Sequence, residues 1–310
     1  MAIPVLVTSA LPQSCRDSLE EKFEVHDYKA AADRAALLAE VGPKIRAIAG
    51  SGVNAELLSA LPNLGIVASF GVGYDTVDIA AAKARKIPVT NTPDVLDDAV
   101  AELTVGLMLA LSRRIVAADR YVRAGNWTAK GNYPFTTELT GRTLGIAGLG
   151  RIGKEVARRA QGLKMRVVYF GRHRQPKEPF VYYDDLTEMA RDSDWLLMMT
   201  PGGKATEGIV DRKVLEALGP EGILVNMSRG SVVDQDVLVE MLVAGKLGGA
   251  ALDVFANEPD VPEALFGLDN VVLSPHHASG TYETRKAMGD LLIANIEAFL
   301  AGDPLLSAVA

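Results

Sequence analysis

Short runs of apolar and β-branched residues alternate with segments of helical periodicity along nearly the whole chain. This alternation is typical of βαβ units, in which helices connect parallel strands and cover the sheet. A first series predicts strands at Pro4–Thr8, Ile45–Ala49, Gly65–Ser69 and Pro88–Asn91, with helices at Asn54–Ala60 and Val77–Lys86. A second series predicts strands at Thr143–Ala147, Arg166–Phe170, Trp195–Thr200, Ile223–Met227, Gly249–Val254 and Val271–Ser274, with helices at Ile152–Gly162, Arg212–Ala217 and Asp234–Ala244. Each series fits one doubly wound parallel sheet, so the pattern predicts an α/β protein of two domains.

One long helical pattern separates the two series. It runs from Val95 to Arg123, and small or apolar residues lie on several of its faces. A helix that is apolar nearly all round is usually buried, so we expect this crossover to be covered by its own chain or by a partner subunit. The last helical pattern, Tyr282–Leu300, follows the final strand and could return to the first sheet. The predicted domains are therefore residues 1–97 with 281–310, and residues 98–280.

Composition and charge narrow the possible functions. The chain has 310 residues, a formal net charge of −7 and 48% hydrophobic residues, which indicates a packed globular protein with room for two domains. An acidic balance argues against a general nucleic-acid binder, because such proteins present a basic face. The longest apolar stretch, Val105–Leu111, is too short to cross a bilayer. Since the single cysteine, Cys15, allows no disulfide within the chain and no targeting segment is evident, we expect a cytoplasmic protein.

A glycine-rich turn follows the strand predicted at Thr143–Ala147. It has the pattern G-x-G-x-x-G, with Gly148, Gly150 and Gly153, and leads directly into a helical pattern. In this setting the first two glycines allow a tight turn and close approach of a pyrophosphate, and the third lets helix and strand pack closely. An ordinary strand-to-helix turn is the alternative. We expect a dinucleotide to be bound by Gly148, Leu149, Gly150, Arg151, Ile152 and Gly153.

The residues after the next predicted strand indicate which dinucleotide is bound. A site for NAD would offer Asp or Glu to the ribose hydroxyls there, whereas this chain reads Gly171-Arg172-His173-Arg174. A carboxylate repels a 2′-phosphate, while guanidinium groups bind it through charge-assisted hydrogen bonds. The alternative is an exposed basic loop without a ligand. We predict NADP(H) as the cofactor, bound by Arg172, His173 and Arg174, and we predict no metal ion.

Three further polar residues follow late strands of the second series, where ligands of open α/β sheets collect. Reduction of a 2-oxo acid needs a group that holds the carboxylate and polarises the carbonyl, and the fork-shaped cation of Arg229 suits both tasks. The reaction also needs a proton donor, for which an imidazole such as that of His276 is well suited. Glu258 is the candidate carboxylate that would stabilise the protonated ring. Taken singly, these residues could be a helix-entry cap, a buried histidine and a loop carboxylate, so the prediction depends on their joint occurrence after a dinucleotide motif.

Six short segments spread over almost the whole chain form a highly specific combination. They are Gly71–Asp75, Gly148–Gly153, Ser228–Gly230, Gly249–Val254, Asn257–Pro259 and Ser274–His276. Together they resemble the D-isomer-specific 2-hydroxyacid dehydrogenases. Within that family, Gly171–Arg174 and Ser279–Lys286 look most like the NADPH-dependent glyoxylate/hydroxypyruvate reductases and the hydroxyphenylpyruvate reductases. The resemblance implies a flavodoxin-like substrate-binding domain, a Rossmann coenzyme domain, and a homodimer formed through the coenzyme domain.

The resemblance also implies roles for single residues. Arg229 would bind the substrate, His276 would donate the proton, and Glu258 would pair with His276; these three are the expected catalytic residues. Formate dehydrogenases of the superfamily carry glutamine where Glu258 stands, so a formate activity is disfavoured. The resemblance places Asp253 at the nicotinamide carboxamide and leaves His277 structural. The other expected contacts are Val72 and Gly73, whose backbone N–H groups would hold the substrate carboxylate, and Thr200, Met227, Ser228, Ser279 and Gly280, which would line the cofactor.

Two alternatives stand beside NADPH-dependent reduction of small 2-oxo acids to D-2-hydroxy acids. One is a non-enzymatic regulator of the same fold that senses a dinucleotide. The other is an oxidising enzyme related to phosphoglycerate or phosphite dehydrogenases, which the missing acidic residue disfavours. The sequence leaves the substrate open among glyoxylate, hydroxypyruvate, a phenylpyruvate and a sugar-derived keto acid. Its side-chain pocket could draw on Ser51-Gly52, Tyr74 and the aromatic loop Trp127–Phe135 of a neighbouring subunit.

Overall fold

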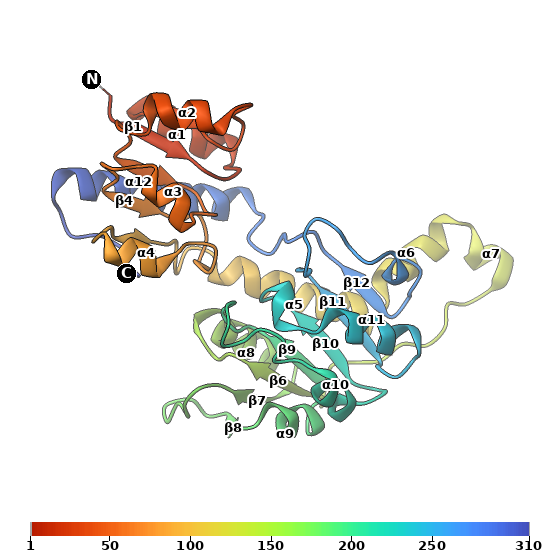
Figure 1. Cartoon of the computed structure of the whole chain (residues 1–310). Helices are drawn as coiled ribbons and strands as arrows, with labels where there is room; N and C mark the ends of the chain where they lie inside the picture. The colour runs from red at the N-terminus through yellow and green to blue at the C-terminus, as the bar shows by residue number, and fades with distance from the viewer. Residues whose placement is uncertain (1, 310) are drawn as a thin grey trace. The chain divides into compact units, whose positions relative to one another are not determined.

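The computed structural model describes residues 2–309, and the chain folds into two compact units (Figure 1). Unit 1 consists of Met1–Leu96 and Ser279–Ala310, and unit 2 of Asp97–Ala278. Each unit contains one sheet with parallel strands, so the predicted fold class of two doubly wound parallel sheets is confirmed. No helix within residues 2–309 is long and apolar enough to span a bilayer.

The sheet of unit 1 has five strands in the order β2-β1-β3-β4-β5. They are β1 (Pro4–Val7), β2 (Glu24–Asp27), β3 (Ala47–Ala49), β4 (Ile66–Ala68) and β5 (Val89–Thr90). This is the strand order of a flavodoxin-like sheet, with the switch point between β1 and β3. The loops at the carboxyl ends of the strands are therefore the part of unit 1 suited to a ligand.

Helices cover both faces of this sheet because side chains alternate along each strand. The helices α1 (Gln13–Lys22) and α12 (Tyr282–Ala301) pack on the face that carries Val5 and Val7. The helices on the face that carries Leu6 are α2 (Arg34–Val41), α3 (Ala55–Ser59) and α4 (Ile79–Ala84). The C-terminal helix thus completes the core of unit 1, although all of unit 2 separates it in sequence from the other elements.

The sheet of unit 2 has seven strands in the order β12-β11-β10-β9-β6-β7-β8. They are β6 (Thr143–Ala147), β7 (Arg166–Phe170), β8 (Val181–Tyr183), β9 (Trp195–Met198), β10 (Ile223–Asn226), β11 (Gly249–Leu252) and β12 (Val271–Leu273). This is a Rossmann order with one additional strand, and the switch point lies between β6 and β9. A dinucleotide in such a fold crosses the carboxyl ends of the strands at that point.

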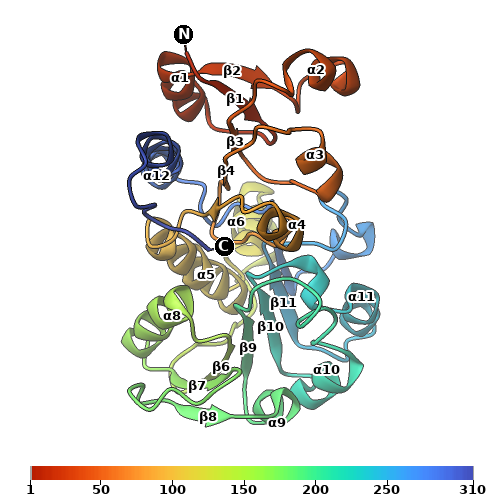
Figure 2. The ribbon, with the colours of Figure 1, turned by 60° about the vertical axis from the view of Figure 1, so that its left-hand side comes forward.

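Two sets of helices cover the second sheet (Figure 2). The helices α5 (Asp97–Ser112) and α8 (Arg151–Gly162) pack on one face. The other face carries α9 (Leu186–Arg191), α10 (Arg212–Leu218) and α11 (Gln235–Val243). Two short 3-10 turns, Gly230–Val232 and Glu263–Leu265, lie in the loops after β10 and before β12. Both faces of the sheet are buried, which accounts for the continuous apolar runs of its strands.

The prediction of one helix from Val95 to Arg123 is wrong, because the structure breaks it at Arg113–Arg114. Helix α5 ends at Ser112, and α6 (Ile115–Arg123) begins after Arg114, whose φ is +49°. The N–H of Thr137 donates to the carbonyl O of Ser112 at 3.2 Å, and the hydroxyl of Ser112 donates to the carbonyl O of Thr137 at 2.9 Å. The carbonyl O of Ser112, which would accept the next hydrogen bond of a continuing helix, thus accepts one from a segment that is distant in sequence.

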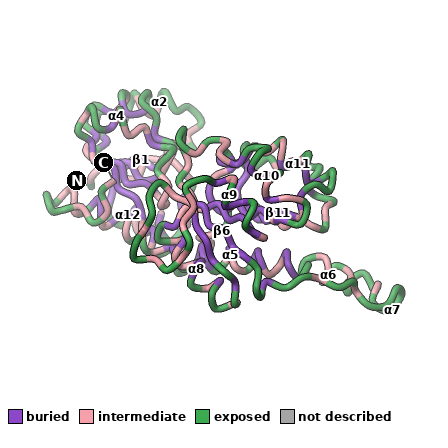
Figure 3. The backbone as a smooth tube through the Cα atoms, turned by 90° about the horizontal axis from the view of Figure 1, so that it is seen from below, coloured by how far each residue is buried: buried purple, intermediate pink, exposed green. Residues whose placement is uncertain are grey.

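The two parts of that predicted helix also differ in burial. Helix α5 buries most of its residues in unit 2, whereas no residue of α6 is buried. A short helix, α7 (Asn126–Lys130), lies in the stretch predicted as an aromatic loop, and Trp127 there is 61% exposed. Figure 3 shows α6 and α7 as an exposed extension away from the sheet of their own unit. We call residues 113–140 the arm.

Candidate active site

The glycine-rich turn between β6 and α8 leaves room for a phosphate. A Cβ atom at Gly148 would lie 2.6 Å from the carbonyl O of Met199, and one at Gly153 would lie 2.3 Å from the carbonyl O of Gly148, so both positions require glycine. At Gly150 a Cβ atom would meet no described atom within 4 Å. Gly150 is also the N-cap of α8. No side chain of the described residues therefore caps the first turn of α8, and the N–H groups at such a helix start commonly bind phosphate.

The segment Gly171–Gln175, which we call the arginine loop, begins beside this turn. The N–H of Gly148 donates to the carbonyl O of Phe170 at 2.9 Å, and this bond joins the end of β6 to the end of β7. Arg172, His173 and Arg174 follow β7 directly, and all three are exposed. The structure therefore places the start of the arginine loop beside the glycine-rich turn, in the region where the sequence predicts the 2′-phosphate of the coenzyme.

Asn226, at the end of β10, holds the turn that carries Arg229. Its side chain is 2% exposed; Oδ1 accepts a hydrogen bond from the N–H of Ser228 at 3.1 Å, and Nδ2 donates to the carbonyl O of Arg229 at 3.0 Å. Arg229 is half-buried, and its guanidinium donates to the carbonyl O of Ser228 at 2.8 Å. Sequence reasoning missed this role of Asn226. The available signal was an asparagine directly after a buried strand, where its side chain commonly bonds to the backbone of a turn.

A backbone contact joins the Arg229 turn to the segment after β11. A Cβ atom at Gly230 would lie 1.9 Å from the carbonyl carbon of Phe255, so only glycine allows the two backbones to approach this closely. The N–H of Phe255 in turn donates to Oε1 of Glu258 at 3.1 Å. Arg229 and Glu258 are therefore carried by two segments in direct contact.

Glu258 and His276 lie within hydrogen-bonding distance of each other. Nδ1 of His276 is 2.7 Å from Oε2 of Glu258, and the two side chains are 48% and 36% exposed, respectively. The φ of His276 is +48°, which is uncommon for a residue other than glycine, and its N–H donates to the carbonyl O of Asp253 at 2.8 Å. The contact at Nδ1 orients the ring and leaves Nε2 as the nitrogen that can meet a substrate.

The buried carboxylate of Asp253 organises the loop that carries His276. Asp253 is 1% exposed, and it accepts hydrogen bonds from Oγ of Ser274 at 2.5 Å and from the N–H groups of His277 and Ala278 at 2.8 and 3.1 Å. These bonds tie the loop after β12 to the end of β11. The family resemblance implies that Asp253 faces the nicotinamide carboxamide; the structure adds this positioning role, which no motif signals.

The residues described so far follow strands of unit 2, so they lie at the carboxyl ends of the strands of one sheet. Thr200 follows β9, and its carbonyl O accepts a hydrogen bond from the hydroxyl of Ser228, which follows β10. Met227, between β10 and Ser228, is buried. The other expected contacts belong to unit 1: Ser51, Gly52, Val72, Gly73, Tyr74, Ser279 and Gly280. Within residues 2–309, no group of three or more His, Cys, Asp or Glu side chains could hold a metal ion.

In unit 1, the loop after β4 presents two backbone N–H groups. Gly71 has a φ of +142°; its N–H donates to Oγ1 of Thr92 at 3.1 Å, and its carbonyl O accepts from the N–H of Thr92 at 3.0 Å. The carbonyl O of Val72 accepts from Nδ2 of Asn91 at 2.9 Å. These bonds fix the loop without using the N–H groups of Val72 and Gly73, which can therefore serve an anion.

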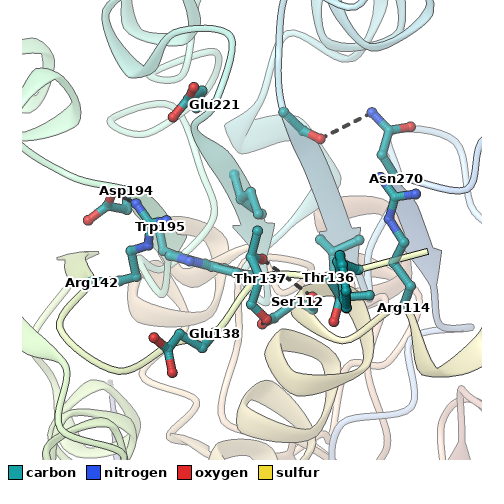
Figure 4. A pocket seen from close by; sticks show the side chains of 14 residues that line it. Ser112, Arg114, Thr136, Thr137, Glu138, Arg142, Asp194, Trp195, Glu221 and Asn270 are labelled. Carbon is teal, nitrogen blue, oxygen red and sulfur yellow. Dashed lines mark hydrogen bonds and ion pairs between the residues drawn. The ribbon is translucent and has the colours of Figure 1, made fainter. Parts of the chain in front are cut away.

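A cavity of about 340 Å³ lies at the amino ends of the unit 2 strands, opposite their carboxyl ends (Figure 4). Its lining includes residues at or just before the amino ends of strands, such as Arg142, Trp195 and Asn270, together with residues of the arm. The glycine-rich turn, Arg229 and His276 all follow the carboxyl ends of strands instead. The cavity is therefore separate from the candidate active site.

Comparisons with known proteins identify relatives that span the whole chain. A sequence model of the D-isomer specific 2-hydroxyacid dehydrogenase, NAD binding domain, matches residues 105–278. The hydroxyphenylpyruvate reductase of Plectranthus scutellarioides is 46% identical, and a glyoxylate/hydroxypyruvate reductase of Arabidopsis thaliana is 45% identical, each over 99% of both chains. The crystal structure of an NADPH-dependent glyoxylate/hydroxypyruvate reductase from Sinorhizobium meliloti, in complex with NADP and malonate, has a TM-score of 0.95 and 41% identity, covering 100% of this chain and 97% of that one.

Proposed function

Because the chain belongs to the D-isomer-specific 2-hydroxyacid dehydrogenases, a family of oxidoreductases, we propose that it reduces small 2-oxo acids to D-2-hydroxy acids with NADPH. The proposed substrates are glyoxylate, hydroxypyruvate and related 2-oxo acids. The observation that carries the proposal is the 2.7 Å contact between His276 and Glu258. Both residues lie at the carboxyl ends of the unit 2 strands, as Arg229 and the glycine-rich turn do. Full-length relatives named as reductases of this kind add support.

Three side chains divide the work of the proposed reaction. Bound NADPH supplies the hydride that reduces the carbonyl carbon of the substrate. The guanidinium of Arg229 binds the substrate carboxylate and polarises the carbonyl, because it is a permanent cation with its donors in a fork. Nε2 of His276 gives a proton to the carbonyl oxygen as negative charge develops there. Glu258 keeps the ring of His276 oriented through Nδ1.

The proposed binding residues come from both units. We propose that the N–H groups of Val72 and Gly73 bind the substrate carboxylate, since the bonds that fix their loop leave these two groups for a ligand. The pyrophosphate is assigned to the turn Gly148–Gly153, and the 2′-phosphate to the arginine loop. The remaining cofactor contacts are proposed to be Thr200, Met227, Ser228, Asp253, Ser279 and Gly280.

A panel of 2-oxo acids, assayed by the loss of NADPH absorbance, tests the proposed activity. We expect glyoxylate or hydroxypyruvate to be reduced with a kcat of about 1–10³ s⁻¹, the ordinary range for enzymes. A protein that binds NADPH but reduces no member of the panel would be a dinucleotide-sensing regulator, and the proposal would be wrong. The names of the relatives, all enzymes, favour the reductase.

The double variant Arg172→Ala/Arg174→Ala is expected to lower the preference for NADPH over NADH. Both side chains are exposed in the arginine loop, and each would lose a charge-assisted hydrogen bond to the 2′-phosphate. We expect the NADPH/NADH ratio of kcat/KM to fall by roughly 10- to 100-fold, mainly through the KM for NADPH. Arg191→Ala, an exposed arginine of α9, is the control. An unchanged ratio would show that the two arginines do not contact the coenzyme.

We also propose that the protein is a homodimer and that the arm forms its interface. Among the large apolar side chains that the described structure exposes, five lie in the arm: Ile115, Val116, Val122, Trp127 and Phe135. Apolar side chains gathered on one exposed segment mark a surface that binds another protein. A second copy presents the same segment, so a two-fold dimer can cover both.

The double variant Ile115→Asp/Phe135→Asp is expected to convert the dimer into a monomer. Each subunit would bury two carboxylates without partners in an apolar interface. We expect this desolvation penalty to exceed the binding free energy of the dimer. Light scattering after gel filtration should then give the chain mass of 33.0 kDa instead of twice that mass. Phe266→Asp replaces an exposed aromatic residue outside the arm and should leave the dimer intact. Wild-type protein that elutes with the mass of one chain would contradict the proposed dimer.

A further inference from the structure

Three hydrogen bonds anchor the arginine loop to the structure around it. At its start, the hydroxyl of Tyr182 donates to the carbonyl O of Gly171 at 3.1 Å. At its end, the N–H of Gln175 donates to the hydroxyl of Tyr169 at 2.6 Å. The third anchor is the side chain of Gln175, whose Nε2 donates to the carbonyl O of Leu149 at 2.8 Å. Because Leu149 belongs to the glycine-rich turn, this last bond links the two predicted phosphate sites directly.

The groups that hold the loop are themselves fixed. Tyr169 is 1% exposed within β7, and its ring centroid lies 5.3 Å from that of Tyr182 in β8. The carbonyl O of Gln175 accepts from the N–H of Glu178, whose carboxylate lies 2.8 Å from Nζ of Lys154 in α8. Contacts from β7, β8 and α8 therefore support the two ends of the arginine loop.

Side chains within the loop point in two directions. Arg172, His173 and Arg174 are exposed, whereas Gly171 and Gln175 at the two ends are half-buried. The amide of Gln175 turns inward to the glycine-rich turn, while its three neighbours are presented to solvent. The inward bond therefore joins the loop to the glycine-rich turn and leaves the three basic side chains exposed.

We propose that Gln175 is a positioning residue that sets the distance between the arginine loop and the glycine-rich turn. This inference rests on the proposed preference for NADPH. The pyrophosphate and the 2′-phosphate of NADP(H) are attached to the same ribose, so the two protein segments that bind them must be held at a matching distance. The bond from Gln175 to Leu149 fixes that distance before the coenzyme arrives, so the loop need not be ordered during binding. NADH has no 2′-phosphate and gains nothing from the bond.

Binding measurements on the full chain test this role without relying on turnover. For Gln175→Ala we expect the Kd of NADPH, and that of 2′,5′-ADP as a fragment with the 2′-phosphate, to rise by roughly 3- to 10-fold, with a change below about twofold for NADH. In steady-state kinetics the KM for NADPH should rise much more than kcat falls. Gln161→Ala, an exposed glutamine of α8, is the matched control.

The same substitution in the Arg172→Ala/Arg174→Ala background separates positioning from a general loosening of the site. If Gln175 acts through the arginines, Gln175→Ala should add less than about twofold to the Kd of NADPH there. If Gln175→Ala does not fold, Gln175→Glu decides the matter, because it keeps the size of the side chain and removes the donor to the carbonyl O of Leu149; it should weaken NADPH binding selectively as well.

Two results would overturn the inference. Equal changes in the Kd of NADPH and NADH, including no change in either, would mean that Gln175 does not act on the 2′-phosphate. A full additional effect in the double-arginine background would mean that it does not act through the arginines. Wild-type protein that binds NADPH and NADH equally would instead contradict the proposed cofactor preference, and this inference with it, so the two failures are distinguishable.

Discussion

Replacing His276 with alanine is expected to lower kcat for 2-oxo acid reduction by about 10²- to 10⁴-fold, the usual contribution of a positioned general acid. The imidazole lies 2.7 Å from Glu258 and is 48% exposed, so it is both oriented and accessible to a substrate. Without it, the proton for the developing alkoxide must come from water, which is a weaker acid than an imidazolium. Steady-state rates with glyoxylate and hydroxypyruvate, at saturating NADPH, give the measurement.

The neighbouring histidine provides the control for this prediction. His277 is exposed, and its backbone N–H, not its ring, contacts Asp253. His277→Ala should therefore retain turnover within about twofold, as surface substitutions usually do. Glu258→Gln should lose less than His276→Ala, because glutamine can still accept a hydrogen bond from Nδ1. Near-normal turnover of His276→Ala would remove the proton-donor assignment.

The central strands of both sheets could be predicted because burial on two faces leaves continuous apolar runs. Strands β6 and β7 occupy the predicted residues, Thr143–Ala147 and Arg166–Phe170. The edge strands β2 (Glu24–Asp27) and β8 (Val181–Tyr183) were missed. In β2, Glu24 is exposed and the other three residues are only half-buried, so this segment carries a weak apolar signal. Strand β8 has only three residues, of which Val181 is exposed, so it is too short to show a pattern.

The break between α5 and α6 shows a second limit of sequence reasoning. The local pattern favours one helix, and nothing near Ser112 indicates that its carbonyl is used elsewhere. The competing partner, Thr137, lies 25 residues away in sequence. A helix boundary set by such a tertiary contact cannot be predicted from periodicity, because periodicity describes only the helix itself.

The residues of the candidate site could be predicted where a sequence motif carries them. They could not be predicted where their role depends on a contact with a segment that is distant in sequence. The glycine-rich turn, Arg229 and His276 each follow a predicted strand. In a parallel sheet the carboxyl ends of all strands lie on the same side, so these residues are expected to lie there together. The inward bond of Gln175 and the bonds of Asn226 link backbone and side-chain groups whose distances only the fold determines. These supporting residues give the motif its geometry.

Arg229→Ala is expected to lower kcat/KM for 2-oxo acids by about 10²- to 10⁴-fold, with losses in both substrate binding and turnover. The guanidinium is assigned two partners: the carboxylate, which is charged before and during the reaction, and the carbonyl oxygen, which becomes charged only as hydride is transferred. Losing the first contact raises KM, and losing the second lowers kcat. Arg229→Lys keeps the charge but not the fork, so its loss should be smaller.

Three measurements separate this role of Arg229 from a structural one. The Kd of NADPH and the Tm should change little in Arg229→Ala, while oxamate, an unreactive 2-oxo acid analogue, should bind far more weakly. Arg212→Ala removes an exposed arginine that pairs with Glu240 at 2.5 Å in the same unit, and it should leave kcat/KM unchanged. If Arg229→Ala weakened NADPH binding as much as oxamate binding, the guanidinium would serve the coenzyme, and the carboxylate would need another cation at this edge of the sheet.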